Sequence, residues 1–155
     1  MSVIMPGSYD PVTLGHIEMI KEVAKEEKEV YVVIFSNPNK TYRFSLSDRV
    51  RMLLIATEGL ENVTVSYSLG RVVDYMREHG ISKIVKGYRN DADLAWENEQ
   101  AEYNMKHGGY ETRLIKCLPE YEHISSSAVR YALDNKLGTE GLLDKRVYEY
   151  IKNIG

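Results

Sequence analysis

The sequence predicts an α/β fold: a doubly wound, open, parallel five-stranded sheet of the Rossmann-like type, with helices closing the C-terminal end. Two observations support this prediction. Short runs rich in β-branched residues are continuously apolar, as is typical of strands covered on both faces. Helical patterns separate these runs and are long enough to connect parallel strands. The 155 residues are expected to form one domain, 1–155, because a single core commonly serves a chain of this length.

The strands are expected where apolar runs end at residues that break extended structure. They cover residues 3–5, 30–35, 63–65, 81–86 and 112–118. Pro6-Gly7 ends the first strand, Asn37-Pro38-Asn39 ends the second, and Gly87 stops the fourth. Sheets of this kind bind ligands beyond the carboxyl ends of the strands, near the point where the strand order reverses. Functional residues should therefore follow directly after strands.

The helices are expected where apolar residues recur at a spacing of three and four. One begins near Gly15, and a second begins at Ser45, where Asp48 three residues later forms a short capping box. The remaining helices cover 72–78, 91–106, 126–135 and 144–153. Gly80 is expected to close the helix at 72–78. The sequence thus alternates strands and helices from end to end.

Composition and charge exclude several classes of function. The formal net charge of −3 argues against nucleic-acid binding, which needs clustered Lys and Arg. The N-terminus lacks the basic segment of a signal peptide, and no apolar stretch approaches the roughly 20 residues that span a bilayer. Cys117 is the only cysteine, which excludes an intramolecular disulfide and favours a reducing compartment. We therefore expect a cytoplasmic protein with no nucleic-acid or membrane partner.

The segment Gly7–His16 follows the first strand and has the features of a phosphate-binding turn. Gly7 permits a close approach of the backbone to a ligand. Thr13 and His16 lie three residues apart across a helix start, so both can face the same anion. Gly15 leaves the N–H donors of the helix N-terminus open, and these carry a partial positive charge. A helix cap with an incidental surface histidine is the alternative, which the strand–turn–helix context disfavours.

Two later segments carry further groups suited to a nucleotide. Arg89 follows the fourth strand and presents a planar fork of donors to phosphate, with a surface salt bridge as the alternative. Glu97 can accept a hydrogen bond from a ribose or adenine group, unless it belongs to a solvated helix face. The three serines 125–127 offer hydroxyl and backbone N–H groups at another helix start, where an ordinary serine cap is the alternative.

Three blocks in this order resemble the nucleotidyltransferase superfamily. Thr13-Leu14-Gly15-His16 is similar to its (His/Thr)-x-Gly-His signature. Lys86-Gly87-Tyr88-Arg89, followed by Asp93 and Glu97, resembles the Arg-Gly-x-Arg…Asp…Glu segment of bacterial phosphopantetheine adenylyltransferases. Ile124-Ser125-Ser126-Ser127-Ala128-Val129-Arg130 resembles their Ile-Ser-Ser-(Ser/Thr) helix start. The match runs in register over nearly the whole chain, which makes it far more specific than any single block.

The resemblance implies transfer of AMP from ATP to 4′-phosphopantetheine, with His16 and Arg89 as catalytic residues. The implied ATP-binding residues are Ser8, Tyr9, Thr13, Gly15, His16, Gly87, Tyr88, Arg89, Glu97, Tyr121, Ile124, Ser125, Ser126 and Ser127. The implied phosphopantetheine-binding residues are Ser8, Lys40, Val72 and Lys86. Mg²⁺ is expected to stay with ATP phosphates and water, because no His/Asp spacing builds a metal site held by the protein. The resemblance also suggests a homo-hexamer and feedback binding of coenzyme A.

Departures from the family pattern bear on the acceptor. Lys86 replaces an arginine, Arg71 occupies a position that is usually apolar, and His123 has no assigned role. The alternatives are an adenylyltransferase of the same fold that uses nicotinamide mononucleotide, and a non-catalytic nucleotide-binding sensor. Cytidylyl transfer is disfavoured because Arg-Thr-x-Gly-Ile-Ser is absent before the last helix. Trp96 and Tyr103 are expected to be packing or interface groups.

Overall fold

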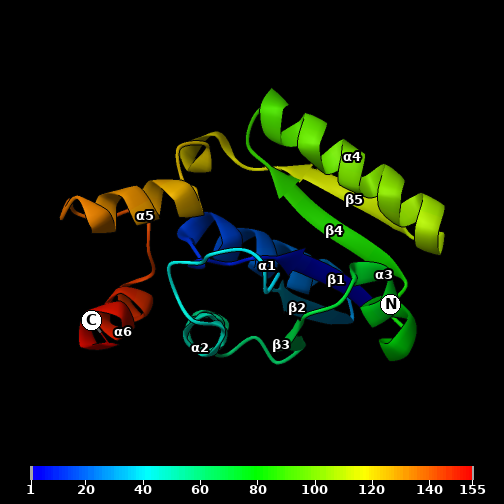
Figure 1. Ribbon diagram of the computed structural model, residues 1–155, viewed down its shortest axis with the longest axis horizontal. Coiled ribbons are helices and arrows are strands. Elements are labelled where there is room, and N and C mark those ends of the chain that lie inside the picture. Colours follow the sequence, from blue (N-terminus) through cyan, green and yellow to red (C-terminus); the bar gives the residue numbers. More distant parts are fainter. Residues whose placement is uncertain (1, 155) are drawn as a thin grey trace.

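A computed structural model describes residues 2–154 and contains one five-stranded sheet with helices around it (Figure 1). The strands are β1 (Ser2–Gly7), β2 (Glu29–Phe35), β3 (Val63–Ser68), β4 (Lys83–Tyr88) and β5 (Glu111–Lys116). The α-helices are α1 (Leu14–Glu26), α2 (Leu46–Ala56), α3 (Val72–His79), α4 (Asp91–Gly108), α5 (Ser126–Asp134) and α6 (Lys145–Ile154). A 3-10 turn, η1 (Pro119–Tyr121), joins β5 to α5.

The strand order is β3-β2-β1-β4-β5, and every neighbouring pair is parallel. The predicted doubly wound parallel sheet is therefore confirmed. The chain runs outward from β1 through β2 to β3, then crosses back to β4 on the other side of β1. The order reverses between β1 and β4, so the carboxyl ends of these two strands flank the crevice where such sheets bind ligands.

Apolar side chains cover both faces of the sheet, as the continuous apolar strands predict. Successive residues of β1 point to opposite sides, so Val3 and Met5 join the larger core cluster and Ile4 joins the smaller. Helices α1, α2, α5 and α6 contribute to the larger cluster, whereas α3 contributes to the smaller one. Helix α4 lies along β4 and β5 (Figure 1). The helices described by the structure are too short or too polar to cross a bilayer.

The predicted helix ends at Ser45 and Gly80 are confirmed. The Ser45 hydroxyl accepts a hydrogen bond from the Asp48 N–H at 3.1 Å, which satisfies one of the unpaired donors at the start of α2. Gly80 closes α3 with φ of 65°, a left-handed conformation that favours glycine.

The prediction that Gly87 stops the fourth strand is wrong. Strand β4 continues to Tyr88 because β5 pairs with it there, with Gly87 opposite Ile115 and Tyr88 opposite Lys116. Gly87 serves packing instead. A Cβ at this position would lie 2.9 Å from the Cε of Met19 on α1. The glycine therefore allows α1 to pack closely over the end of β4.

Candidate nucleotide site

A cleft of about 340 Å³ opens at the carboxyl ends of β1 and β4, where the strand order reverses. The start of α1, η1 and the start of α5 complete its walls. Every residue predicted to bind ATP lines this one cleft: Ser8, Tyr9, Thr13, Gly15, His16, Gly87, Tyr88, Arg89, Glu97, Tyr121, Ile124, Ser125, Ser126 and Ser127. The structure therefore brings together three sequence blocks that are more than 100 residues apart at their extremes.

His16 is held in one tautomer by the turn that precedes it. The backbone N–H of Thr13 donates to Nδ1 of His16 at 2.9 Å. Because that backbone group can only donate, Nδ1 is an unprotonated acceptor and the ring proton lies on Nε2. The Tyr9 ring packs edge-on against the imidazole with centroids 5.0 Å apart. The cleft wall thus carries a neutral histidine with one fixed N–H donor.

The electrostatic surroundings also keep His16 neutral. Burial lowers the pKa of His16 from 6.5 to about 4, and the positive charges of Lys86 and Arg89 contribute to the same shift. All of these causes disfavour the imidazolium. At neutral pH His16 is therefore a hydrogen-bond donor without charge.

Thr13 also caps the helix that carries His16. Its hydroxyl accepts the His16 backbone N–H at 3.3 Å, so it forms a capping box with His16 at the start of α1. Thr13 is only 1% exposed. The Thr13 hydroxyl thus caps the helix and its backbone orients the imidazole, while both residues line the same cleft, and their contact with one anion stays a prediction.

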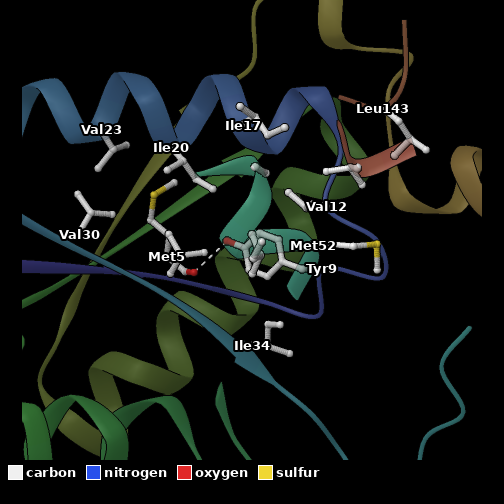
Figure 2. Close-up of a cluster of buried hydrophobic side chains, with 14 of the residues drawn as sticks. Met5, Tyr9, Val12, Ile17, Ile20, Val23, Val30, Ile34, Met52 and Leu143 are labelled. Atoms are coloured by element: carbon white, nitrogen blue, oxygen red, sulfur yellow. Dashed lines mark hydrogen bonds between the residues drawn. The ribbon is translucent and has the colours of Figure 1, made fainter. Parts of the chain in front are cut away.

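Tyr9 also supports the site from the core side. Its hydroxyl donates to the Met5 carbonyl at 2.9 Å, and the ring lies in the larger apolar cluster (Figure 2). Burial, followed by the carboxylate of Glu97, raises the pKa of Tyr9 above its ordinary value, so the hydroxyl stays protonated. Tyr9 adopts a positive φ of 47°, which is unusual for a bulky residue. Tyr9 therefore packs against His16 and also lines the cleft.

Arg89 lies at the end of β4 and already has a partner. Its Nε lies 3.0 Å from Oδ2 of Asp93, and one Nη donates to Oδ1 at 3.2 Å. Only the Nη contact is a hydrogen bond, and the Arg89 backbone N–H donates to Oδ2 of Asp93 at 3.1 Å. Four of the five guanidinium N–H donors therefore remain for a ligand in the cleft. A surface salt bridge was the alternative to a phosphate-binding role. The salt bridge with Asp93 orients Arg89 and still leaves N–H donors for a phosphate.

Lys86 and Glu97 form an ion pair beside the cleft. The Lys86 ammonium lies 3.1 Å from Oε2 of Glu97 and also donates to the Pro6 carbonyl at 3.3 Å. Glu97 is 7% exposed, and its other oxygen, Oε1, has no partner among the described residues. Glu97 thus lies on the buried side of α4 rather than on a solvated face, with one acceptor available to a ligand.

The serines at the start of α5 fix the turn as well as the helix. Ser125 caps α5 by accepting the Ala128 N–H at 3.0 Å, and Ser126 donates to the Pro11 carbonyl at 2.8 Å. Ser127 accepts from Arg130, which also donates to the Asp10 carbonyl at 2.9 Å. The hydroxyls are therefore engaged within the protein. Apart from the Ala128 N–H, which Ser125 accepts, the backbone N–H groups at this helix start could hold an anion.

A second cleft of about 210 Å³ adjoins the first. Both clefts are lined by Pro6, Gly7, Ser8, Lys86 and Glu97, so they share one wall. Val72, also predicted to bind the acceptor, lines only the second cleft. Lys40 lines neither cleft; it is exposed on the loop after β2, with its ammonium 5.5 Å from the Tyr42 ring.

Several residues near the site were missed from the sequence. Trp96, expected to be a packing or interface group, is 60% exposed and lines the first cleft, as does Cys117. Arg49 and Asp10 are buried beside the Ser8 turn and bind its backbone or the loop after β2. The Asp10-Pro11 pair in the turn was the available signal for Asp10. The sequence carries no such signal for Arg49, because an arginine in an amphipathic helix is usually solvent-exposed.

Comparison with known proteins agrees with this geometry. A family model described as cytidylyltransferase-like matches residues 4–132, which include every block that lines the first cleft. The chain therefore belongs to this family of nucleotidyltransferases. A phosphopantetheine adenylyltransferase from Thermobifida fusca (strain YX) is 40% identical over 128 residues, covering 83% of this chain and 78% of the relative. The resemblance to phosphopantetheine adenylyltransferases inferred from the sequence is thus confirmed.

Proposed function

We propose that this transferase moves AMP from ATP to 4′-phosphopantetheine, giving dephospho-coenzyme A and pyrophosphate in the biosynthesis of coenzyme A. The shared wall of the two clefts is the observation that carries this proposal. A nucleotide in the larger cleft and a second phosphorylated substrate in the smaller one would meet at Ser8 and Lys86. The name of the Thermobifida fusca relative supports this choice of acceptor.

The reaction needs alignment rather than a general base. An oxygen of the acceptor phosphate, already anionic, attacks the α-phosphorus of ATP, and the bond to the leaving pyrophosphate breaks. Negative charge develops on the α-phosphate oxygens during this step. We assign the Nε2–H of His16 as a donor to these oxygens, since its neutral tautomer is fixed before substrate binds. A donor held in place in this way costs no reorganisation when the charge develops.

We assign three positive side chains to places around the phosphates. The four remaining guanidinium N–H donors of Arg89, with the N-terminus of α5, would bind the β- and γ-phosphates. Lys86 has one ammonium donor beyond its bonds to Pro6 and Glu97, and it would reach the acceptor phosphate at the shared wall. Lys40 would join it when its exposed side chain swings toward the cleft.

Mg²⁺ fits this site as a companion of the nucleotide. Within residues 2–154 no cluster of three or more His, Cys, Asp or Glu side chains has the arrangement of a metal site. Phosphate oxygens and water would therefore supply most of the ligands, as is common for Mg²⁺. When bound, the ion neutralises phosphate charge, while the protein residues align the two substrates.

Pyrophosphate release tests the activity and the acceptor together. The protein is incubated with ATP and Mg²⁺, with 4′-phosphopantetheine or nicotinamide mononucleotide as the acceptor. We expect pyrophosphate release when 4′-phosphopantetheine is the acceptor and none when nicotinamide mononucleotide is the acceptor. Activity only with nicotinamide mononucleotide would refute the acceptor, and no release with either would favour a non-catalytic sensor. Release from CTP in place of ATP would show that the donor is wrong.

Three further parts of the proposal depend on the family resemblance. We infer a hexamer, feedback binding of coenzyme A, and action in the cytoplasm. The exposed side chains of Tyr103 and Met105 on α4 offer apolar surface for assembly. The second cleft, which would hold the arm of the acceptor, can hold the same arm in coenzyme A. The lone cysteine, Cys117, fits a reducing compartment.

A further inference from the structure

We propose that Arg49 is a positioning residue that fixes the acceptor side of the site before the substrates bind. Arg49 lies on α2, lines neither cleft, and is 2% exposed. The inference rests on the proposed function, because Ser8 and Lys40 define an acceptor side only if phosphopantetheine is the acceptor.

The Arg49 guanidinium joins three segments of the chain. Its Nε donates to the Phe44 carbonyl at 3.1 Å, and its Nη atoms donate to the Ser8 carbonyl at 3.1 Å and the Ser36 hydroxyl at 3.0 Å. Ser36 and Phe44 are the two ends of the loop that carries Lys40. One planar group therefore holds both ends of this loop against the backbone of Ser8, the residue at the junction of the two clefts.

Neighbouring contacts also hold the two ends of the loop that carries Lys40, which form the base of the loop. The buried carboxylate of Asp10 accepts the backbone N–H groups of Arg43 and Phe44, both at 2.9 Å. The Tyr42 ring lies 4.0 Å from the guanidinium carbon of Arg49. The base of the loop is thus fixed by buried charges on each side. Its tip, residues 37–40, is exposed, which leaves the Lys40 side chain room to swing.

The position demands the shape of arginine in addition to its charge. Three acceptors from three directions match the fork of a guanidinium, whereas a lysine ammonium acts as a point charge. An error of about 1 Å in the placement of reacting groups can cost a factor of about 100 in rate. Ser8 lines both clefts, whereas the loop that carries Lys40 belongs to the acceptor side alone. A loosened loop should therefore weaken acceptor binding more than ATP binding.

Arg49→Lys tests this role, with Arg51→Lys on the exposed face of the same helix as the control. Amide hydrogen exchange of the ligand-free protein gives the first measurement. In Arg49→Lys we expect the amides of Asn37, Lys40 and Phe44, which are hydrogen-bonded here, to exchange about tenfold faster, the loss expected for about one hydrogen bond. The amides of α4 and α5 should keep their protection, and Arg51→Lys should match the wild type throughout.

Steady-state kinetics gives the second measurement. Arg49→Lys should raise the KM for 4′-phosphopantetheine about tenfold and change the KM for ATP by less than about twofold. Unchanged loop exchange, or an equal rise in both KM values, would overturn the positioning role. Exchange that rises throughout the protein would overturn it too, since Arg49 would then be a general stabiliser. If the wild type rejects 4′-phosphopantetheine, the proposed function fails, and the exchange measurement alone still decides whether Arg49 fixes the loop.

Discussion

At the scale of single residues, His16 shows how a backbone contact defines chemistry. The Thr13 N–H fixes the acceptor nitrogen, burial and two cations remove the charge, and the remaining N–H becomes a donor. His16→Ala should lower kcat by about 100- to 1,000-fold, as expected when a preorganised donor to a developing charge is removed. The KM for ATP should change far less, because the donor acts mainly in the transition state.

The matched control is His107→Ala on the exposed part of α4, where the ring stacks on Tyr103 and lines neither cleft. Its kcat should equal that of the wild type. Steady-state assays with saturating acceptor separate kcat from KM. A parallel loss of kcat and ATP affinity in His16→Ala would show that His16 binds the ground state only.

The lowered pKa of His16 also predicts how stability depends on pH. Unfolded, this histidine titrates near 6.5; folded, it titrates at about 4. The unfolded chain binds the proton more readily between these values, so acid favours unfolding. The contribution is fully present above pH 6.5 and is lost as the pH falls toward 4. It amounts to about 3 kcal/mol at most, at 1.36 kcal/mol per pKa unit.

Urea unfolding at several pH values measures this contribution. His16→Gln has no titrating group at this site, so its free energy of unfolding should fall less steeply than that of the wild type between pH 6.5 and 4. Carboxylates titrate in the same range but are common to both proteins, and the difference isolates His16. Identical slopes would mean that His16 titrates alike in the folded and unfolded chain.

At the scale of elements, the cap of α1 combines stability with function. Thr13→Ala removes the side chain that accepts the His16 N–H and should lower the free energy of unfolding by about 1 kcal/mol. Ser45→Ala removes the equivalent cap of α2, lines neither cleft, and should cost about the same. Only Thr13→Ala should also lower kcat, because the Thr13 hydroxyl lies 3.1 Å from Nδ1 of His16 and its loss removes one of the contacts that hold the imidazole. Paired denaturation and kinetic measurements check this, and unchanged kcat in Thr13→Ala would separate the cap from the site.

The elements were predictable from the sequence where local physics decides them. Ser45 and Gly80 carry the backbone requirements of a helix start and a helix end, and both were predicted correctly. The order of strands and helices also follows from local apolar patterns. Gly87 was read as a strand breaker because its partner strand and the close approach of Met19 are non-local. Local signals therefore set the element types, and packing sets where they end.

The candidate site was predictable to a similar limit. The three blocks could be predicted to lie near one another, because sheet topology gathers the carboxyl ends of the strands that precede them. In the structure they line one cleft. The partners of these residues were not predictable, since the Lys86–Glu97 and Arg89–Asp93 pairs depend on the orientation of α4 on the sheet. Arg49 was missed for the same reason. Its three acceptors lie on separate segments, so nothing in the sequence near Arg49 indicates them.

At the scale of the whole molecule, the reversal of strand order explains why two clefts meet. Strands β1 and β4 diverge into helices on opposite faces, and the crevice between their ends opens toward both. The end of β1 supplies the wall that the clefts share, with Lys86 and Glu97 beside it. A ligand that spans the wall should therefore contact more of the protein than either of its halves.

Dephospho-coenzyme A tests this view, because it joins an adenylate to a pantetheine arm. At one fixed concentration it should raise the melting temperature more than AMP or 4′-phosphopantetheine alone, since a ligand stabilises the folded state according to its affinity. Each added 1 kcal/mol of binding should raise the melting temperature by about 2–4 °C. Val72→Asp places a charge in the second cleft, at the first residue of α3, where an acidic side chain suits the helix. This variant should respond to dephospho-coenzyme A as it does to AMP, with its AMP response unchanged. An undiminished response to dephospho-coenzyme A in Val72→Asp would show that the arm binds elsewhere.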